Sequence, residues 1–109
     1  MIKVTALLIR RPELSHEQFM RHWVDVHAPL VDALPGLKRY VQNYIQGEQV
    51  VPVPNIGLAL DGIAELWFED RPSFERAFNS PEGQRLAWDG AQFIGRISFF
   101  IIDERVVIS

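Results

Sequence analysis

The residue whose type and position most clearly suit it to chemistry is His27. It follows Trp23 by four residues, so it lies on the apolar side of a predicted helix, directly before Ala28 and Pro29. A neutral imidazole there can accept or donate a proton near neutral pH. The alternative is a core histidine whose ring nitrogens bond to backbone carbonyls, and spacing alone does not separate these two interpretations.

Asp89 is the second candidate, because it places a carboxylate on the apolar side of another predicted helix. It comes three residues after Leu86 and four before Phe93. A buried carboxylate needs a partner, which here is a histidine, an arginine such as Arg85 or Arg96, or backbone amides. A histidine partner would have its pKa raised by the carboxylate. A purely structural role for Asp89 also stays open.

The remaining histidines and acidic residues fit simpler roles. His16 lies in the first turn of the predicted first helix, and His22 is expected to point outward from that helix. Asp61 precedes Gly62, a pair typical of turns. Glu65 lies among apolar residues of a predicted strand, where it serves either a functional site or an ion pair at an interface.

Aromatic side chains are placed to form the walls of a binding site. Tyr40 and Tyr44 share one face of a predicted strand, and aromatic walls with a few hydroxyl groups suit a flat, apolar, cyclic ligand. The alternative is plain core and interface packing. The candidate substrate-binding residues are Trp23, Tyr44, Trp67 and Phe93.

Composition excludes several function classes. The 109 residues include no cysteine, which excludes disulfides, thiolate nucleophiles and cysteine-based zinc or iron–sulfur sites. Glycine-rich nucleotide loops and zinc-protease motifs are also absent, so we expect neither cofactor nor metal. The net charge of −3 comes without a basic stripe for nucleic acid. No segment resembles a signal peptide or a membrane span, so we expect a cytoplasmic protein that binds no membrane.

The elements that must position these residues follow the order strand, helix, strand, strand, helix, strand. Patterning predicts strands at 2–9, 37–46, 63–69 and 96–107. Capping residues predict a first helix from Ser15, with a kink or a break at Pro29 just after His27, and a second helical stretch in two pieces from Asp70 and Ser80. This is the ferredoxin-like α+β plait, an antiparallel sheet with helices on one face.

The buried stripe of the first helix is predicted to consist of Phe19, Trp23, Val26, Leu30 and Leu34. The first and last strands are apolar on both faces, although helices can cover only one face of the sheet. An uncovered apolar sheet face normally marks a subunit interface, so we expect a homodimer formed sheet to sheet. The length predicts a single domain over residues 1–109.

Several segments together resemble the EthD-type family of the dimeric α+β barrel superfamily. In chain order they are Ser15-His-Glu-Gln-Phe19, Val26-His-Ala-Pro-Leu30, Pro35-Gly-Leu-Lys-Arg-Tyr-Val41, Asp61-Gly-Ile-Ala-Glu-Leu-Trp-Phe68, Ser80-Pro81-Glu82, and Asp89 ahead of Phe93. The resemblance covers nearly the whole chain and implies a ferredoxin-like dimer. Proteins of this kind include methylmuconolactone methylisomerases, polyketide cyclases or dehydratases, and cofactor-free monooxygenases.

The resemblance to the methylmuconolactone methylisomerases implies a pocket histidine at His27 and a pocket tyrosine at Tyr40, which hydrogen-bonds a substrate oxygen. A second pocket histidine, on the long loop of those enzymes, has no counterpart here. The corresponding loop reads Gln49-Val-Val-Pro-Val-Pro-Asn55.

The leading hypothesis is a small cofactor-independent enzyme that acts on a hydrophobic cyclic or aromatic metabolite by acid–base catalysis. It would be an isomerase, cyclase or dehydratase in a catabolic or secondary-metabolite pathway, with His27 as general acid or base, Tyr40 on the substrate oxygen and Asp89 orienting the site. Two alternatives are a non-catalytic ligand-binding or accessory protein of an oxidative ether- or aromatic-degradation system, and a haem-binding protein with His27 as axial ligand.

Overall fold

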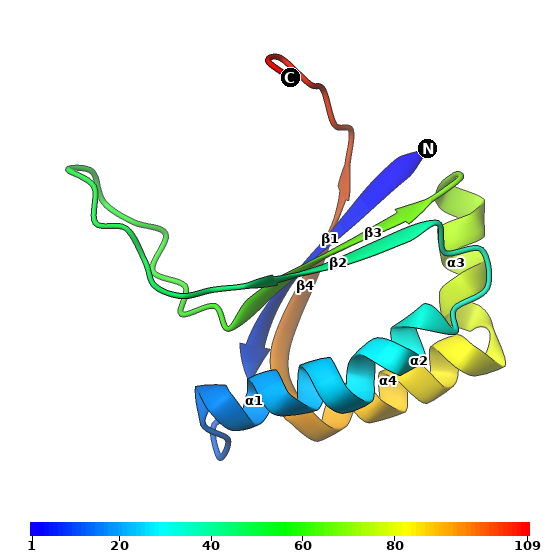
Figure 1. The fold of residues 1–109 in the computed structure, drawn as a ribbon, viewed down its shortest axis with the longest axis horizontal. Coiled ribbons are helices and arrows are strands. Elements are labelled where there is room, and N and C mark those ends of the chain that lie inside the picture. The colour runs from blue at the N-terminus through cyan, green and yellow to red at the C-terminus, as the bar shows by residue number, and fades with distance from the viewer.

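The elements of the chain follow the predicted order (Figure 1). The computed structural model describes residues 1–109. In chain order the elements are β1 (Ile2–Arg10), α1 (His16–His22), the π-helix η1 (Trp23–His27), α2 (Ala28–Asp32), β2 (Arg39–Tyr44), β3 (Gly62–Phe68), α3 (Arg71–Asn79), α4 (Pro81–Phe93) and β4 (Ile94–Ile102). The last strand therefore ends earlier than the predicted range 96–107.

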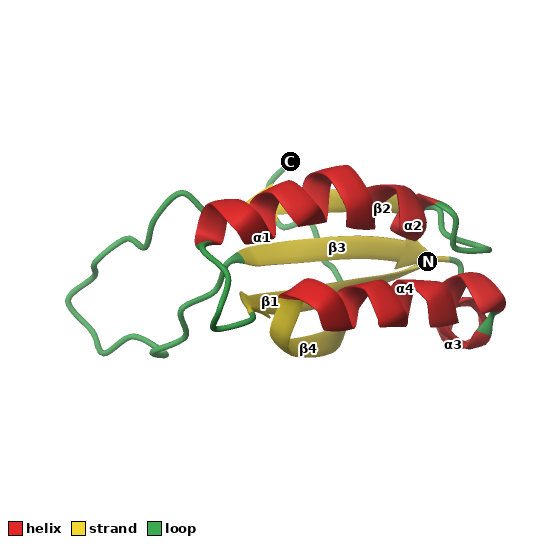
Figure 2. Ribbon diagram, turned by 90° about the horizontal axis from the view of Figure 1, so that it is seen from below, coloured by secondary structure: helices red, strands yellow, loops and turns green.

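The four strands form one antiparallel sheet in the order β2-β3-β1-β4. The helices all lie on one face of this sheet, as Figures 1 and 2 show from two directions. This order and this layering confirm the predicted ferredoxin-like plait.

The central strand β1 shows how the sheet separates its two faces. Val4, Ala6 and Leu8 point toward the helices and are at most 2 % exposed. Successive side chains of a strand point to opposite faces, so Lys3 and Leu7 lie on the face without helices. The core therefore sits between the helices and one face of the sheet.

The first helix begins at the predicted capping box. The Ser15 hydroxyl accepts from the Gln18 backbone N–H at 3.1 Å, and the Gln18 side chain accepts from the Ser15 N–H at 2.8 Å. Farther along, the backbone N–H of Ala28 bonds to the carbonyl of Trp23, five residues back. This wide turn directly precedes Pro29, which has no N–H to donate. In place of the predicted kink or break, the structure has a π-helical turn within a continuous helix.

The π-helical turn changes which residues of the helix are buried. Val26 was predicted to be buried, but it is 46 % exposed, whereas Val31 is 3 % exposed. A π turn takes up an extra residue, so the core-facing side runs from Trp23 through His27 to Val31. The prediction for Val26 was wrong because it assumed uninterrupted α-helical spacing.

The second helical stretch begins at the two predicted caps. The Asp70 side chain accepts from the Ser73 N–H at 2.8 Å, and the Ser80 hydroxyl accepts from the Gly83 N–H at 3.1 Å. A Cβ at Gly83 would lie 2.4 Å from the carbonyl oxygen of Ala77, so glycine allows α4 to start this close to α3. None of the helices is long and apolar enough to cross a membrane.

The face of the sheet opposite the helices is uncovered and mixed in character. Phe100 on β4 is 49 % exposed there. On the neighbouring strands Glu65 forms an ion pair with Lys3 and accepts from the Asn43 side chain at 2.9 Å. The open face therefore joins apolar surface on one side to an ion pair on the other.

The connection between β2 and β3 is long and irregular. Residues 45–61 contain no helix or strand, and in Figure 1 this segment extends beyond one end of the sheet, away from the helices. The predicted strands at 37–46 and 63–69 likewise leave a long connection at 47–62.

Candidate active site

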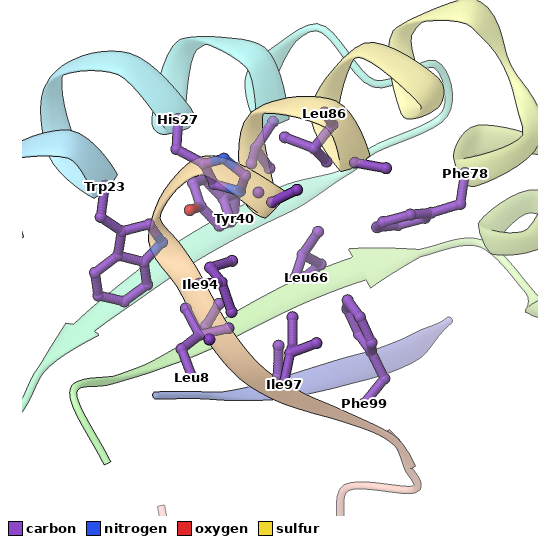
Figure 3. A pocket seen from close by; sticks show the side chains of 17 residues that line it. Leu8, Trp23, His27, Tyr40, Leu66, Phe78, Leu86, Ile94, Ile97 and Phe99 are labelled. Atoms are coloured by element: carbon purple, nitrogen blue, oxygen red, sulfur yellow. The ribbon is translucent and has the colours of Figure 1, made fainter. Parts of the chain in front are cut away.

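An apolar cavity of about 350 Å³ lies between the helices and the sheet (Figure 3). Of its 17 lining residues, 14 are hydrophobic, and the only titratable ones are His27 and Tyr40. Ala6 and Ala64 face each other across β1 and β3, and their small side chains leave room for the cavity. The exposed residues Ile97 and Phe99 place its mouth along β4.

His27 is buried, and one of its two ring nitrogens is engaged in a hydrogen bond. The residue is 8 % exposed, and its Nδ1 lies 2.8 Å from Oδ2 of Asp89. A carboxylate only accepts hydrogen bonds, so Nδ1 carries the proton of the neutral ring. Nε2 then keeps its lone pair, on an imidazole that lines the cavity.

Burial lowers the pKa of His27 below the usual histidine value. The hydrogen bond and the charge of Asp89 act in the opposite direction, and the charge of His22 adds to the lowering. The predicted rise in pKa was wrong, because the loss of hydration outweighs the carboxylate. The result is an imidazole that is neutral at pH 7 and able to accept a proton.

Asp89 lies behind His27, on α4, and is 5 % exposed. Two histidines share it: His27 and also His22, whose Nε2 lies 3.0 and 3.1 Å from the two carboxylate oxygens. Arg85 and Arg96 form no ion pair with it. The prediction that His22 points outward was wrong, because the flank of α1 that carries it faces α4.

Tyr40 contributes the second polar group of the cavity, from the helix-facing side of β2. Burial raises its pKa to about 12, against hydrogen bonds from Gln42 and Trp23 that lower it. The hydroxyl therefore stays protonated at neutral pH. In Figure 3 Trp23, His27 and Tyr40 gather toward one end of the cavity, and Phe78 and Phe99 lie toward the other.

Gln42 determines whether the Tyr40 hydroxyl can act as a hydrogen-bond donor or acceptor toward a ligand. Its Nε2 donates to the backbone carbonyl of Trp23 at 3.1 Å and to the Tyr40 hydroxyl oxygen at 2.8 Å. A carbonyl only accepts, so this atom must be the amide nitrogen. The Tyr44 hydroxyl donates to the other end of the amide at 2.9 Å. The hydrogen of Tyr40 is therefore free to donate to a ligand.

The four predicted substrate-binding aromatic residues occupy different places. Trp23 is fully buried and lines the cavity. Phe93 lies behind the cavity, with its ring centroid 4.4 Å from that of His22 and 4.9 Å from that of His27. Tyr44 is 52 % exposed and packs edge-on against Trp23.

Trp67 lies outside the cavity, contrary to the sequence-based prediction. The strand register pairs it with Lys3 and Arg39, and both cations lie over its ring, at 5.3 and 4.7 Å from the centroid. Strand alternation is the reason: Leu66 and Phe68 face the helices, so Trp67 between them faces the open side of the sheet.

Sequence reasoning did not single out two polar residues of this region, His22 and Gln42. Gln42 could have been found, because it lies between Tyr40 and Tyr44 on one face of a strand, where a polar side chain meets both hydroxyls. His22 carried no comparable signal, since its role depends on how α1 packs against α4. No group of three histidine or acidic side chains converges to hold a metal ion.

A second buried carboxylate, Asp61, joins three elements at one corner of the fold. It is 1 % exposed and accepts from the Arg10 backbone N–H and Nη1, both at 2.7 Å, and from His16 Nδ1 at 2.8 Å. Burial raises the pKa of Asp61, but these bonds together outweigh that effect and lower it. His16 lies in the first turn of α1 and Asp61 in the bend before Gly62, as predicted, but their contact with each other and with Arg10 was not predicted.

Fold and cavity together define a ferredoxin-like α+β protein with an apolar pocket that holds one histidine and one tyrosine. Comparison with known proteins gives the family: the model of the EthD domain matches residues 11–97, and the chain belongs to the EthD family.

Two similar proteins illustrate this family, and a further solved structure illustrates the fold alone. The 4-carboxymethyl-4-methylbutenolide mutase of Pseudomonas reinekei is 32 % identical over 111 residues, covering 97 % of this chain and 100 % of the relative. The crystal structure of an EthD family protein from Bacillus halodurans has a TM-score of 0.77 at 27 % identity and covers 96 % of this chain and 99 % of its own. A dimeric ferredoxin-like protein of unknown function from Thermobifida fusca shares the fold, with a TM-score of 0.69, 15 % identity, and coverage of 93 % of this chain and 88 % of its own.

Proposed function

We propose that this protein is an enzyme that isomerises a small cyclic metabolite by acid–base catalysis, with no cofactor. The observation that carries the proposal is the pairing of polar groups in one apolar cavity: the free Nε2 of His27 and the free hydroxyl hydrogen of Tyr40. Asp89, behind His27, supplies the charge that stabilises the imidazole once it is protonated.

The chemistry that suits these groups is proton abstraction next to a carbonyl group. Nε2 of His27 takes the proton from carbon, and the electron pair of the broken C–H bond moves onto the carbonyl oxygen. Tyr40 donates a hydrogen bond to this developing oxyanion, inside a cavity with mostly apolar walls. His27 then returns the proton to a different carbon, which completes an isomerisation.

We propose unsaturated lactones as the first substrates to consider. The mutase of Pseudomonas reinekei carries a butenolide in its name and is similar over its whole length. A lactone has the ring, the carbonyl oxygen and the small size that an apolar cavity of about 350 Å³ with one hydroxyl donor can bind. Cyclisation and dehydration use the same proton transfers and remain within the proposal.

A ligand screen tests the proposal. The wild type and His27→Ala are compared by thermal shift against 4-carboxymethyl-4-methylbutenolide, other cyclic lactones, aromatic polyketide-like compounds, catechols and haemin. Every stabilising mixture is then checked for product. His16→Ala is the control, because His16 lies outside the cavity and contacts Asp61.

The outcomes separate the candidate functions. A lactone that stabilises the wild type, loses this effect in His27→Ala and is converted to product supports the enzyme. Saturable binding without product would instead indicate a ligand-binding or accessory protein. A Soret band with haemin that vanishes in His27→Ala would indicate a haem protein.

We also propose that two copies associate through the open face of the sheet. The half-exposed Phe100 lies on this face, and so does the ion pair of Lys3 and Glu65. Analytical ultracentrifugation should show a dimer for the wild type and a monomer for Phe100→Glu. The matched control is Trp88→Glu, which also introduces a glutamate but at an exposed residue on the outer side of α4. Phe74→Glu is unsuitable as a control, because Phe74 packs against the core.

We further propose that the protein works in the cytoplasm, on a catabolic or secondary metabolite. Fractionation of the cells that make it, followed by detection of the chain in the cytoplasmic fraction, tests this location.

A further inference from the structure

Asp89 is held between an inner and an outer imidazole. The inner one, His27, has a side chain that is 10 % exposed, and the outer one, His22, has a side chain that is 27 % exposed. Nε2 of His22 approaches both carboxylate oxygens, whereas Nδ1 of His27 approaches Oδ2 alone. The outer histidine is thus the one protein donor to Oδ1.

These contacts fix the position of a proton on each ring. The carboxylate accepts from both rings, so His22 carries its proton on Nε2 and His27 on Nδ1. The ring of Phe93 keeps both imidazoles in place, stacked on His22 and edge-on to His27. Without His22, Oδ1 would be a buried oxygen without a protein donor, and His27 would be the one side chain that donates to the carboxylate.

We propose that His22 is a positioning residue that holds Asp89 against His27 and, through the shared carboxylate, sets how readily Nε2 of His27 takes a proton. The inference rests on the proposed function, because it matters for catalysis only if His27 is the base. His22 itself lines no part of the cavity and does not touch a substrate there.

The charges around His27 determine whether His22 raises or lowers the pKa of His27. The groups that face it are Asp89 from α4, His22 from α1 and, across the cavity, Tyr40 from β2. Asp89 favours the protonated imidazole, and a charge on His22 opposes it. Both imidazoles interact with the single carboxylate of Asp89. His22 therefore weakens the stabilisation that this carboxylate gives to a protonated His27.

Two substitutions at His22 separate its donor, its charge and its ring. His22→Phe keeps a ring on Phe93 and removes both the donor and the charge. His22→Gln removes the charge and the ring but keeps an amide N–H in reach of Asp89. His16→Phe is the control for removal of a histidine, because its partner is Asp61.

The measurement is an NMR titration of the His27 ring nitrogens in the ligand-free protein. We expect the pKa of His27 to rise in His22→Phe, to rise less in His22→Gln, and to stay at the wild-type value in His16→Phe. For any compound that the wild type converts, kcat/KM should be about tenfold lower in His22→Phe than in the wild type. The decrease should be smaller in His22→Gln.

A His27 titration that is the same in the wild type and in both His22 variants would overturn the inference. If His22→Phe does not fold, the titration of His22→Gln decides alone, with unchanged values again counting against His22. The titration needs no substrate. A shifted pKa together with no turnover of any compound would therefore count against the proposed enzyme while leaving the coupling of the two histidines in place.

Discussion

The hydroxyl oxygen of Tyr40 accepts a hydrogen bond of 2.8 Å from Nε2 of Gln42. The hydrogen-bond acceptor of this hydroxyl is thereby used inside the protein, and its hydrogen is left for a ligand. His27 is arranged in the complementary way, with its N–H donated to Asp89 and its lone pair left for a ligand. One apolar cavity therefore offers a proton acceptor and a hydrogen-bond donor together.

Tyr40→Phe should weaken binding of a carbonyl-bearing ligand by about tenfold, because one hydrogen bond to the ligand oxygen is lost. Isothermal titration with a ligand found in the screen measures the loss. Tyr44→Phe is the matched control: its hydroxyl also bonds to Gln42, but Tyr44 does not line the cavity. Equal losses in the two variants would contradict the role given to Tyr40.

Asp89→Asn should lower the free energy of unfolding by about 1–3 kcal/mol, because a buried acceptor shared by two histidines is replaced by a weaker one. The pKa of His27 should fall further, since the charge that raised it is gone. Urea unfolding and an NMR titration measure the two effects. A higher pKa in the variant would show that Asp89 does not stabilise the imidazolium.

The lowered pKa of His27 predicts a dependence of stability on pH. Above the unfolded-state value of 6.5 the imidazole is neutral in both states, and its contribution is fully present. As the pH falls below 6.5, the unfolded chain takes up the proton first, so stability is lost until the pH passes the lower folded value. This loss should have a slope of at most about 1.4 kcal/mol per pH unit.

Urea unfolding between pH 7.5 and pH 5 checks this prediction, with His27→Gln as the comparison. The variant should lose less stability than the wild type over this range. The lowered pKa of Asp61 acts only in a more acidic window, with its contribution present above 3.8 and lost below it. The same loss in the variant and the wild type between pH 7.5 and pH 5 would show that His27 is not the cause.

Gly62→Ala should change the shape of the cavity on the side that Trp23 lines. A Cβ at this position would lie 2.5 Å from Cζ3 and 2.7 Å from Cη2 of the Trp23 ring, so the indole must move. We expect a cost of about 1–3 kcal/mol in the free energy of unfolding and a preference for smaller ligands. Gly47→Ala, where a Cβ meets nothing within 4 Å, is the control.

The fold could be predicted because its signals are local. The capping box at Ser15, the caps at Asp70 and Ser80, and the strand alternation that places Tyr40 and Tyr44 on one face all lie within a few residues of sequence. The buried positions of His27 and Asp89 followed from helical spacing in the same way. Each of these expectations agrees with the structure.

What could not be predicted depends on contacts between elements. Helical spacing cannot reveal that His22 meets Asp89, because the two residues are 67 positions apart and lie on different helices. The pKa of His27 was predicted in the wrong direction for a related reason. A sequence can suggest a carboxylate partner, but the loss of hydration at His27 depends on how closely the surrounding elements pack.

The most direct test of the central claim is hydrogen exchange at carbon in deuterium oxide. The wild type and His27→Gln are incubated with 4-carboxymethyl-4-methylbutenolide and related lactones. Deuterium is followed by NMR at the carbon atoms next to carbonyl or carboxyl groups, including the carboxymethyl CH2 group of the named butenolide. If His27 is the base, the wild type should speed this exchange, and the variant should lose at least about a hundredfold of the rate. An equal rate in both proteins would show that the proton is abstracted elsewhere.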